Sequence, residues 1–445
     1  MRKLMWLVLV LGLLPRALAA QEEGVRLRLL YQPQYQPGLV VLPFTAAGAD
    51  AAAAGTAHAI VRQDLDYSDR FQLKEGTLRP GEPFNARLWK ERGADWVVRG
   101  ELRPRPGGLT LKLSLHDVVY GQLKGEGEFE LPPPGAPGFR MAVHAASDEL
   151  VRWATGEPGA AATRIAFVMQ GRGSKELYLV DYDGENLQRL TNDGSIALSP
   201  AWSPDGRKLA YTSFKNGTPR LYERDLAGGR ERVLSDRAGI NITPSYSPDG
   251  RLLAFATTVA DNTEVATLDV QRNCCLQQHT RGRRYDSLSP SFSPDGRRFA
   301  FVSNRLGEPH VFVMPVGGGE ARLVSVYVHG KGGYNTSPEW SPKGTHIVFH
   351  TRIAGQMQLA IVGADGSNPR QLTNSYANED PSWAPNGRHV VFASPDRDGG
   401  GLFVLDTVSG RIRSVLRGRG YGLPAWSGPM LRLPAQRPAP VAAGR

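Results

Sequence analysis

The residues of this chain that could carry chemistry are two adjacent cysteines and two closely spaced histidines. Cys274 and Cys275 are the only cysteines, and His346 and His350 fit one face of a strand. Consecutive strand residues point to opposite faces, so a disulfide between the cysteines would have poor geometry, and we expect strand filler. A strained redox-active pair is the alternative. Two histidines alone do not form a metal site, and we expect surface or channel residues.

The sequence lacks the motifs of the common catalytic sites. It contains no His-Glu-x-x-His helix, no Gly-x-x-x-x-Gly-Lys phosphate loop and no Gly-x-Ser-x-Gly nucleophile elbow. The aspartates of a repeated turn are explained by turn chemistry and belong to separate repeats. We therefore expect no catalytic residue, no metal and no cofactor, and we predict that the chain is not an enzyme.

A repeated phrase supplies the framework on which any site must be built. Pro-Ala-Trp-Ser-Pro-Asp-Gly-Arg at 200–207 returns at 244–251 and 290–297, and weaker copies begin at 338, 381 and 424. Its central aromatics, 43 to 48 residues apart, are Trp202, Tyr246, Phe292, Trp340, Trp383 and Trp426. Such a period with short strands is typical of a β-propeller with one repeat per blade. Ser-Pro-Asp-Gly is a turn sequence, and we expect the aromatics to pack between blades.

The two ends of the repeat region predict how the ring closes. Each repeat reads as one strand before the turn and three after it. The first three strands, at 164–169, 176–181 and 186–191, have no strand before them, and the last, at 424–427, has none after it. If the last strand joins the first three in one blade, the ring is tied shut and an open edge that could template aggregation is removed. We predict an α/β N-terminal domain followed by an all-β six-bladed β-propeller closed by the C-terminal strand.

Composition predicts the order of segments along the 445 residues. Arg2, Lys3 and an apolar stretch ending in small residues indicate a signal peptide, hence an exported, soluble chain that does not span a membrane. The expected segments are a signal peptide (1–20), an N-terminal arm (21–37), an α/β domain (38–156), a linker (156–162), the propeller (163–427) and a disordered tail (428–445).

Within the α/β domain the patterns predict a small mixed sheet with helices. Helices are expected at 51–65, with Asp50 as N-cap, and at 84–91 and 140–155. Strands are expected at 39–43, 96–102, 109–117 and 125–131.

The expected arm combines an alternating stretch with prolines. Val25, Leu27 and Leu29 alternate with Arg26 and Arg28, and two prolines follow. Proline disfavours both a helix and a central strand. The segment is therefore either an edge strand of the domain or a free arm that can add to a partner's sheet.

The formal net charge of +10 does not point to nucleic acid. A nucleic-acid-binding protein clusters its basic residues on one element, whereas here they are spread over the repeats. We expect a solvated surface, no nucleic-acid partner and a monomer, and contact with acidic partners is left open.

Stretches outside the repeat carry a family resemblance. They are Val-Arg-Leu at 25–27, Val-Val-Leu-Pro-Phe at 40–44, Gly-Ala-Asp-Trp-Val-Val-Arg-Gly at 93–100, His-Ala-Ala-Ser-Asp-Glu-Leu at 144–150, and the segments 163–168, 179–184 and 424–427. In this order, and together with the repeat, they resemble the TolB family, the periplasmic propeller proteins of the Tol–Pal system.

The resemblance implies a non-enzymatic periplasmic scaffold. Such proteins bind the peptidoglycan-associated lipoprotein Pal through the propeller, at the mouth of its central channel. The arm, here Val25, Arg26, Leu27, Arg28 and Leu29, is implied to bind the periplasmic end of the inner-membrane protein TolA, and its ordering to be coupled to Pal binding. The system maintains outer-membrane integrity and helps constriction at cell division.

The resemblance also implies lipoprotein-binding positions just before the repeated proline. Carried over, they are Ile240, Asn241, Leu288 and Ser289, but the family's histidine is Ile240 here and its Thr-Glu pair is Leu288-Ser289. From loops of the same face we add Tyr285, Tyr334, Asn335 and Glu379, the tyrosines because interfaces favour tyrosine anchors. An ordinary surface loop residue is the alternative for each.

Two other functions remain open. The channel could bind a small ligand or a glycan. Propellers with this repeat also occur fused to serine peptidases, but those enzymes need a hydrolase domain with a nucleophile elbow, which this sequence lacks.

Overall fold

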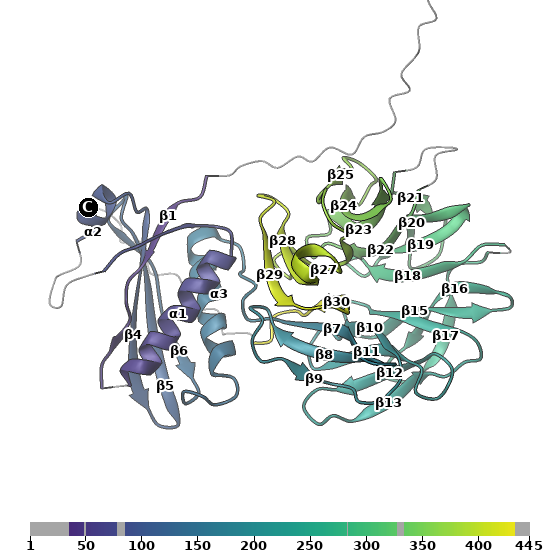
Figure 1. Ribbon diagram of the computed structural model, residues 1–445, viewed down its shortest axis with the longest axis horizontal. Coiled ribbons are helices and arrows are strands. Elements are labelled where there is room, and N and C mark those ends of the chain that lie inside the picture. Colours follow the sequence, from purple (N-terminus) through teal and green to yellow (C-terminus); the bar gives the residue numbers. More distant parts are fainter. Residues whose placement is uncertain (1–34, 49, 78–84, 283, 327–332, 432–445) are drawn as a thin grey trace, which may run out of the picture.

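The computed structural model describes residues 35–48, 50–77, 85–282, 284–326 and 333–431. In Figure 1 these residues form an α/β domain beside a propeller, with α1 and α3 between the sheet and the propeller. The expected signal peptide, the arm residues Val25 to Leu29 and most of the expected tail lie outside the described residues.

The N-terminal domain is a mixed sheet covered by two long helices. Its strands are β1 (Gly38–Val41), β2 (Thr45–Ala46), β3 (Gln72–Lys74), β4 (Trp96–Arg105), β5 (Gly108–Asp117) and β6 (Gln122–Leu131), in the order β3-β1-β4-β5-β6 with β2 beside β4. The helices are α1 (Ala51–Tyr67), α2 (Ala86–Glu91) and α3 (Phe139–Thr155). β1 pairs in parallel with β3 and β4, so the chain returns through α1 before β3 and through α2 before β4.

The helix boundaries follow local capping chemistry. Asp50 accepts a hydrogen bond from the backbone N–H of Ala52 at 2.8 Å, as expected for an N-cap. Asn85 caps α2 in the same way, so that helix begins at Ala86, two residues later than predicted. The three-residue strand β3 was not predicted, because it is too short to show an alternating pattern.

The propeller has six four-stranded sheets, as predicted. Blade 1 comprises β10 (Ala197–Trp202), β11 (Lys208–Ser213), β12 (Arg220–Asp225) and β13 (Glu231–Ser235). Blade 2 comprises β14 (Asn241–Tyr246), β15 (Leu252–Val259), β16 (Asn262–Asp269) and β17 (Cys274–Gln278). Blade 3 comprises β18 (Ser287–Phe292), β19 (Arg298–Leu306), β20 (Glu308–Pro315) and β21 (Arg322–Leu323). Blade 4 comprises β22 (Asn335–Trp340), β23 (His346–Ile353), β24 (Gln356–Gly363) and β25 (Arg370–Gln371). Blade 5 comprises β26 (Glu379–Trp383), β27 (His389–Ser394), β28 (Gly401–Asp406) and β29 (Ile412–Arg417).

Blade 6 closes the ring with strands from both ends of the repeat region. Its order is β30 (Tyr421–Trp426), β7 (Arg164–Gln170), β8 (Lys175–Asp181) and β9 (Gln188–Arg189). The buried indole of Trp426 donates from Nε1 to Thr163 Oγ1 at 2.7 Å, and the backbone N–H of Arg164 donates to Ser427 Oγ at 2.9 Å. These bonds hold the first and last strands together, and the predicted offset closure is confirmed.

The repeated phrase works as a turn and a core residue. In blade 1, Ser203 Oγ donates to Asp205 Oδ1 at 2.6 Å, the backbone N–H of Arg207 donates to the same oxygen, and Gly206 has φ of 70°. A positive φ is the reason for glycine at that position. Five of the six central aromatics are buried and Trp202 is partly buried, so the phrase builds the scaffold.

The prediction for the two cysteines was wrong. Cys274 and Cys275 are joined by a disulfide on the exposed strand β17. Asn273 and Cys275 have positive φ values of 50° and 65°, so the backbone is not extended there. The rule that consecutive side chains point to opposite faces therefore does not hold at this position.

Across the described part of the chain, we find no helix with the length and apolar character required to cross a membrane.

Candidate functional site

The face at which the innermost strands of the blades begin is here called the propeller mouth. The residue before the repeated proline has a positive φ, 48° to 52°, and lies in a register shift in every blade: Ser199, Thr243, Ser289, Ser337, Asp380 and Leu423. A bulge of this kind bends a strand and redirects its side chains. Neighbouring innermost strands contact one another around the ring, so these residues form an inner circle.

Hydrogen bonds link this inner circle from blade to blade. Ser289 donates its backbone N–H to Thr243 Oγ1 at 3.2 Å, and Asp380 accepts from Ser337 Oγ at 3.0 Å and from the backbone N–H of Leu423 at 3.3 Å. His350 Nδ1 accepts the backbone N–H of Asp380 at 2.9 Å. Burial lowers the pKa of His350 despite the nearby carboxylate, so it is a neutral acceptor within the mouth.

The predicted histidine pair does not form one site. His350 lies at the mouth, whereas His346 is half-buried at the other end of β23, where its Nδ1 contacts Thr345 Oγ1 at 2.8 Å. Burial lowers the pKa of His346 as well. Each imidazole has its own protein partner, so the pair separates into a mouth residue and a residue of the opposite face.

The predicted lipoprotein-binding residues all lie at the mouth, but with different burial. Partly exposed are Ile240, Tyr285, Leu288, Ser289, Tyr334 and Glu379. Asn241 is fully buried, donating to the carbonyls of Pro219 and Arg237 and accepting from Ser235 Oγ at 2.8 Å. Asn335 is buried too, with Nδ2 3.1 Å from His310 Nδ1. The two asparagines therefore hold loops, and the six other residues can meet a partner.

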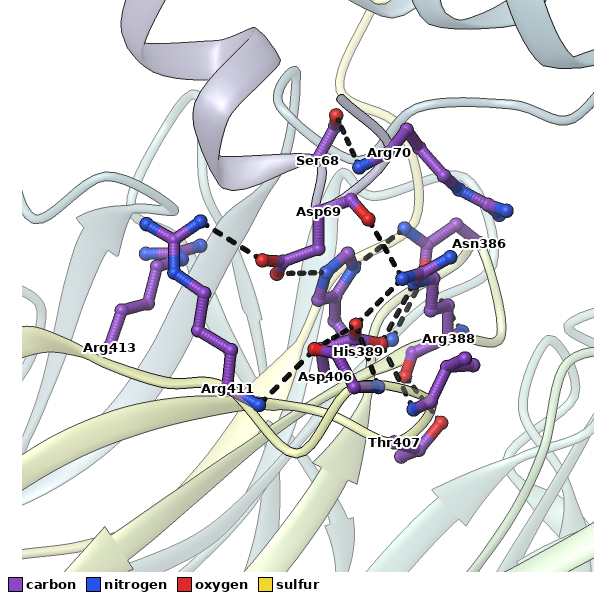
Figure 2. A network of polar contacts seen from close by, with 12 residues as sticks. Ser68, Asp69, Arg70, Asn386, Arg388, His389, Asp406, Thr407, Arg411 and Arg413 are labelled. Carbon is purple, nitrogen blue, oxygen red and sulfur yellow. Dashed lines mark hydrogen bonds and ion pairs between the residues drawn. The ribbon is translucent and has the colours of Figure 1, made fainter. Parts of the chain in front are cut away.

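The second feature is the junction between the α/β domain and the propeller (Figure 2). After α1 ends, Asp69 adopts a positive φ of 55°, a conformation that Asp tolerates better than most residues. Its carboxylate lies 3.0 Å from His389 Nε2 and accepts from Arg411 at 3.0 Å. Arg411 also pairs with Asp66 at 2.7 Å. The end of α1 is thereby fixed to blade 5.

A buried ion pair lies at the centre of the junction. Arg388 and Asp406 form two hydrogen bonds of 2.8 and 2.7 Å, and Arg388 also donates to the backbone carbonyl of Asp69 at 2.8 Å. Burial opposes ionisation of Asp406, but the hydrogen bonds from Arg388 hold its pKa below the ordinary value. Both side chains are almost completely buried, so each depends on the other for charge compensation.

A second cluster joins α1 and α3 to blade 6. His144 Nδ1 lies 2.9 Å from Asp64, its Nε2 lies 3.5 Å from Asp183, and Tyr182 donates to Asp64 at 2.5 Å. Burial favours the neutral imidazole, but the two carboxylates outweigh it and raise the pKa of His144. A protonated His144 can therefore bridge carboxylates from both domains.

His144 is also close enough to Asp181 and Asp183 for the three side chains to resemble a metal-ligand set. Arg164 pairs with Asp181 at 3.0 Å, and Arg140 pairs with Asp183. These cations already balance the carboxylates, so the arrangement is explained as an interdomain ion-pair network.

The predicted linker is held against α3. Asp148 accepts from the backbone N–H groups of Ala161 at 2.7 Å and Ala162 at 2.9 Å, and both alanines are buried. Burial raises the pKa of Asp148 to about 7, and these two hydrogen bonds counteract the rise. The linker therefore fixes the start of the first propeller strand relative to α3.

Sequence reasoning missed the junction, although the repeat contained a signal for it. Lys343 and Asn386, which replace the turn aspartate in two repeats, both lie at the junction. Lys343 pairs with Glu157 of the linker at 2.8 Å, and Asn386 contacts His389 Nδ1 at 2.9 Å. An aspartate at 386 would add a carboxylate beside Asp406 and Asp69. The two departures therefore mark the turns that meet the N-terminal domain.

A cavity of about 370 Å³ opens at the edge of the junction. Its lining includes Tyr35, Trp96 and Tyr120 of the α/β domain and Arg388 of the propeller. Tyr35 donates to Asp95 at 2.8 Å, and Asp95 also accepts the backbone N–H of Gly38 at 2.7 Å. The base of the predicted arm therefore contacts the same region as the buried ion pair.

The His144 cluster predicts a pH-dependent stability. A histidine whose folded-state pKa is raised stabilises the fold below its unfolded value of 6.5, and this contribution is lost as the pH rises through the folded-state pKa. Thermal unfolding should therefore give a Tm that falls as the pH rises above 6.5, and His144→Gln should flatten that fall. His346→Gln, which removes a half-buried histidine far from Asp64 and Asp183, is the control and should retain it. An unchanged slope in His144→Gln would contradict the assignment.

Comparison with known family models gives the same two-part organisation. The model described as the TolB beta propeller domain matches residues 151–430, and the TolB amino-terminal domain matches residues 33–123. The Tol-Pal system protein TolB of Anaeromyxobacter dehalogenans is 37% identical over 209 residues, which cover 45% of this chain and 47% of the relative. The relative in Methylococcus capsulatus is 39% identical over 166 residues, covering 35% and 38%. In these matches the chain spans about half, or less, of the relatives' length.

Among solved structures, TolB from Acinetobacter baumannii superimposes with a TM-score of 0.78 at 27% sequence identity. The superposition covers 91% of this chain and 100% of that one.

Proposed function

Because this chain belongs to the TolB family of the Tol–Pal system, we propose that it is a non-enzymatic periplasmic scaffold that joins two envelope proteins. One partner is a Pal-like lipoprotein bound at the propeller mouth. The other is a TolA-like inner-membrane protein bound by the arm at 21–37. Through these contacts the protein supports outer-membrane integrity and cell division.

The observation that carries this proposal is the construction of the mouth. The six partly exposed residues named above stand on loops of a closed ring, and loops on a rigid scaffold commonly carry binding. We assign contact roles to Ile240, Tyr285, Leu288, Ser289, Tyr334 and Glu379. The buried Asn241 and Asn335 position the loops between them.

Blade 5 supplies a physical route between the two binding regions. Its first hairpin has Glu379 and Asp380 at the mouth and Arg388 and His389 at the junction, separated by strand β26 and its turn. Arg388 of the junction and Tyr35 at the base of the arm line the same cavity. A shift of this hairpin on lipoprotein binding would therefore reach the arm, which supports coupled binding.

A two-bait pull-down tests the proposal. The mature chain should retain both the periplasmic domain of the Pal-like lipoprotein and that of the TolA-like protein from the same organism, at micromolar concentration. Deleting residues 21–32 should abolish retention of the TolA-like domain and leave the Tm nearly unchanged. This segment precedes every described strand, so its loss removes no strand of the described sheets.

Failure of the full-length chain to bind the lipoprotein domain would contradict the scaffold role. A large drop in Tm on deleting 21–32 would instead identify the segment as a structural strand of the domain. The matched control is Tyr35→Phe, which removes the hydrogen bond to Asp95 but keeps the segment.

A further inference from the structure

Three successive blades carry the same pair of side chains at the mouth. A tyrosine just before the innermost strand lies against an arginine at or just beyond the end of the next strand. The distances from the guanidinium carbon to the ring centroid are 4.9 Å for Tyr285–Arg305, 5.0 Å for Tyr334–Arg352 and 4.6 Å for Tyr376–Arg397. The strand pairing imposes the match, because the beginning of each innermost strand lies beside the end of its neighbour. We call these six residues the Tyr–Arg arc.

The three guanidinium groups have no acidic partner in the described part of the chain. Arg305 donates to Ser303 Oγ at 3.2 Å and Arg397 to the carbonyl of Ser375 at 3.4 Å, and both acceptors are neutral. Arg352 is exposed. An arginine stacked on a ring keeps its in-plane N–H groups available, so the arc presents three oriented donors with full positive charge.

Two carboxylates that adjoin residues of the arc in sequence accept backbone N–H groups. Asp286 accepts the backbone N–H of Thr263 at 2.8 Å, and Asp396 accepts that of Ala377 at 2.9 Å. Burial and the neighbouring Asp380 and Asp396 raise the pKa of Glu379. Among the described residues, blades 3 to 5 therefore present three guanidinium groups that form no ion pair with a carboxylate.

The opposite side of the mouth differs in kind. In blade 1, Lys215 also lies over a ring, 4.1 Å from the centroid of Tyr222, but it pairs with Glu231 at 2.6 Å and Asp193 at 3.5 Å. The exposed Ile196 and the partly exposed Ile240 stand at the corresponding edge of blades 1 and 2. The mouth thus has a cationic side and an apolar side.

We propose that the Tyr–Arg arc binds an acidic segment of the protein partner, whose aspartate or glutamate side chains lie over blades 3 to 5 while its apolar residues lie over blades 1 and 2. Guanidinium groups held in a fixed plane suit bidentate contact with carboxylates. Tyrosine and arginine are also the residues that dominate binding energy at protein interfaces. The inference rests on the proposed function, because it names the chemistry of the partner that docks on the mouth.

Isothermal titration of the mature chain with the periplasmic domain of the Pal-like lipoprotein tests this orientation. The triple variant Arg305→Gln, Arg352→Gln and Arg397→Gln should raise the Kd by about tenfold or more, and Arg352→Gln alone should raise it by a smaller factor. Added salt should weaken binding of the unaltered chain more than that of the triple variant. Tyr334→Phe, which keeps the ring, should bind normally, whereas Tyr334→Leu should weaken binding.

Lys215→Gln is the matched control. It also removes one positive charge from the mouth, but that charge lies in blade 1 and is already paired with Glu231 and Asp193. Its Kd should stay within about twofold of the unaltered chain. Arg352→Gln guards against misfolding, since Arg352 is exposed whereas Arg305 also packs on Phe301 and Phe312.

Three results would overturn the inference. If the lipoprotein domain binds but the triple variant behaves like Lys215→Gln, the arc is not the contact and the proposed function stands. If the unaltered chain does not bind that domain, both fail together. If vesicles of anionic phospholipid bind more tightly than the protein domain and compete for the same arginines, the arc recognises a lipid surface and not an acidic protein.

Discussion

Replacing Trp426 by alanine should lower the free energy of unfolding by about 3–5 kcal/mol, in the range measured for large buried aromatics. Trp426 packs with Ile165, Phe167 and Tyr182 in the core of the closing blade. Its indole hydrogen bond to Thr163 and its backbone hydrogen bond to Ser382 Oγ join the last strand to the first and to blade 5. The variant therefore leaves a cavity at the one place where the ring is held shut by residues distant in sequence.

Chemical denaturation measures this effect, and Trp340→Ala is the matched control. Trp340 occupies the equivalent position of blade 4 and is likewise buried, but its blade is continuous in sequence. We expect the Trp426 variant to lose more stability and to expose β30 to limited proteolysis. Equal losses in the two variants would mean that the closing blade contributes no more to the free energy of unfolding than a blade that is continuous in sequence.

Replacing Arg388 by alanine should destabilise the protein by about 3–5 kcal/mol, because it leaves the carboxylate of Asp406 buried without its cation. The same change removes the hydrogen bond to the carbonyl of Asp69, one of the contacts that join the end of α1 to blade 5. The loss should appear as a lower Tm and as faster proteolysis of the segment at 156–162, since the two parts would separate more often.

Arg411→Ala tests whether burial is the cause. Arg411 bonds to Asp66 and Asp69 at the same junction, but its side chain is 44% exposed. A partly exposed pair such as Arg411–Asp66 contributes about 0–1 kcal/mol, and the buried Asp69 keeps its contact with His389. This variant should therefore lose less stability than Arg388→Ala. A second comparison replaces Arg388 and Asp406 together by Met and Leu, which should restore part of the lost stability. If Arg388→Ala and Arg411→Ala were equivalent, the buried pair would not hold the junction.

The propeller was predictable from the sequence because its determinants are local. The repeated turn needs only Ser, Asp and Gly a few residues apart, and its copy number predicted the closing blade. The junction was not predictable in the same way, since Asp69 and His389 meet only after both parts have folded. Its trace in the sequence was the loss of the turn aspartate at Lys343 and Asn386.

The sequence predicted where the mouth lies more accurately than it predicted which side chains contact one another there. Tyr285 and Tyr334 were named from the general preference for tyrosine at interfaces, but their arginine partners were not, because strand pairing alone brings Arg305 and Arg352 beside them. Asn241 was assigned from the family resemblance as a residue that contacts the lipoprotein. In the structure it is completely buried and holds the neighbouring loops by hydrogen bonds. Burial and cross-strand neighbours are properties of the folded chain that residue type does not reveal.

The closing blade also has a consequence for the order in which the protein can be made. Strand β7 is synthesised first among the propeller strands and β30 last, and the bond from Arg164 to Ser427 spans 263 residues. A chain that emerges from its N-terminus must therefore wait as an open arc of blades, with the inner edge of β7 unpaired, until the final strand arrives. Any nascent or partly translocated chain would be exposed to edge-to-edge pairing during that interval. A chaperone that covers β7 until the C-terminus is free would act at the step where this architecture is most vulnerable.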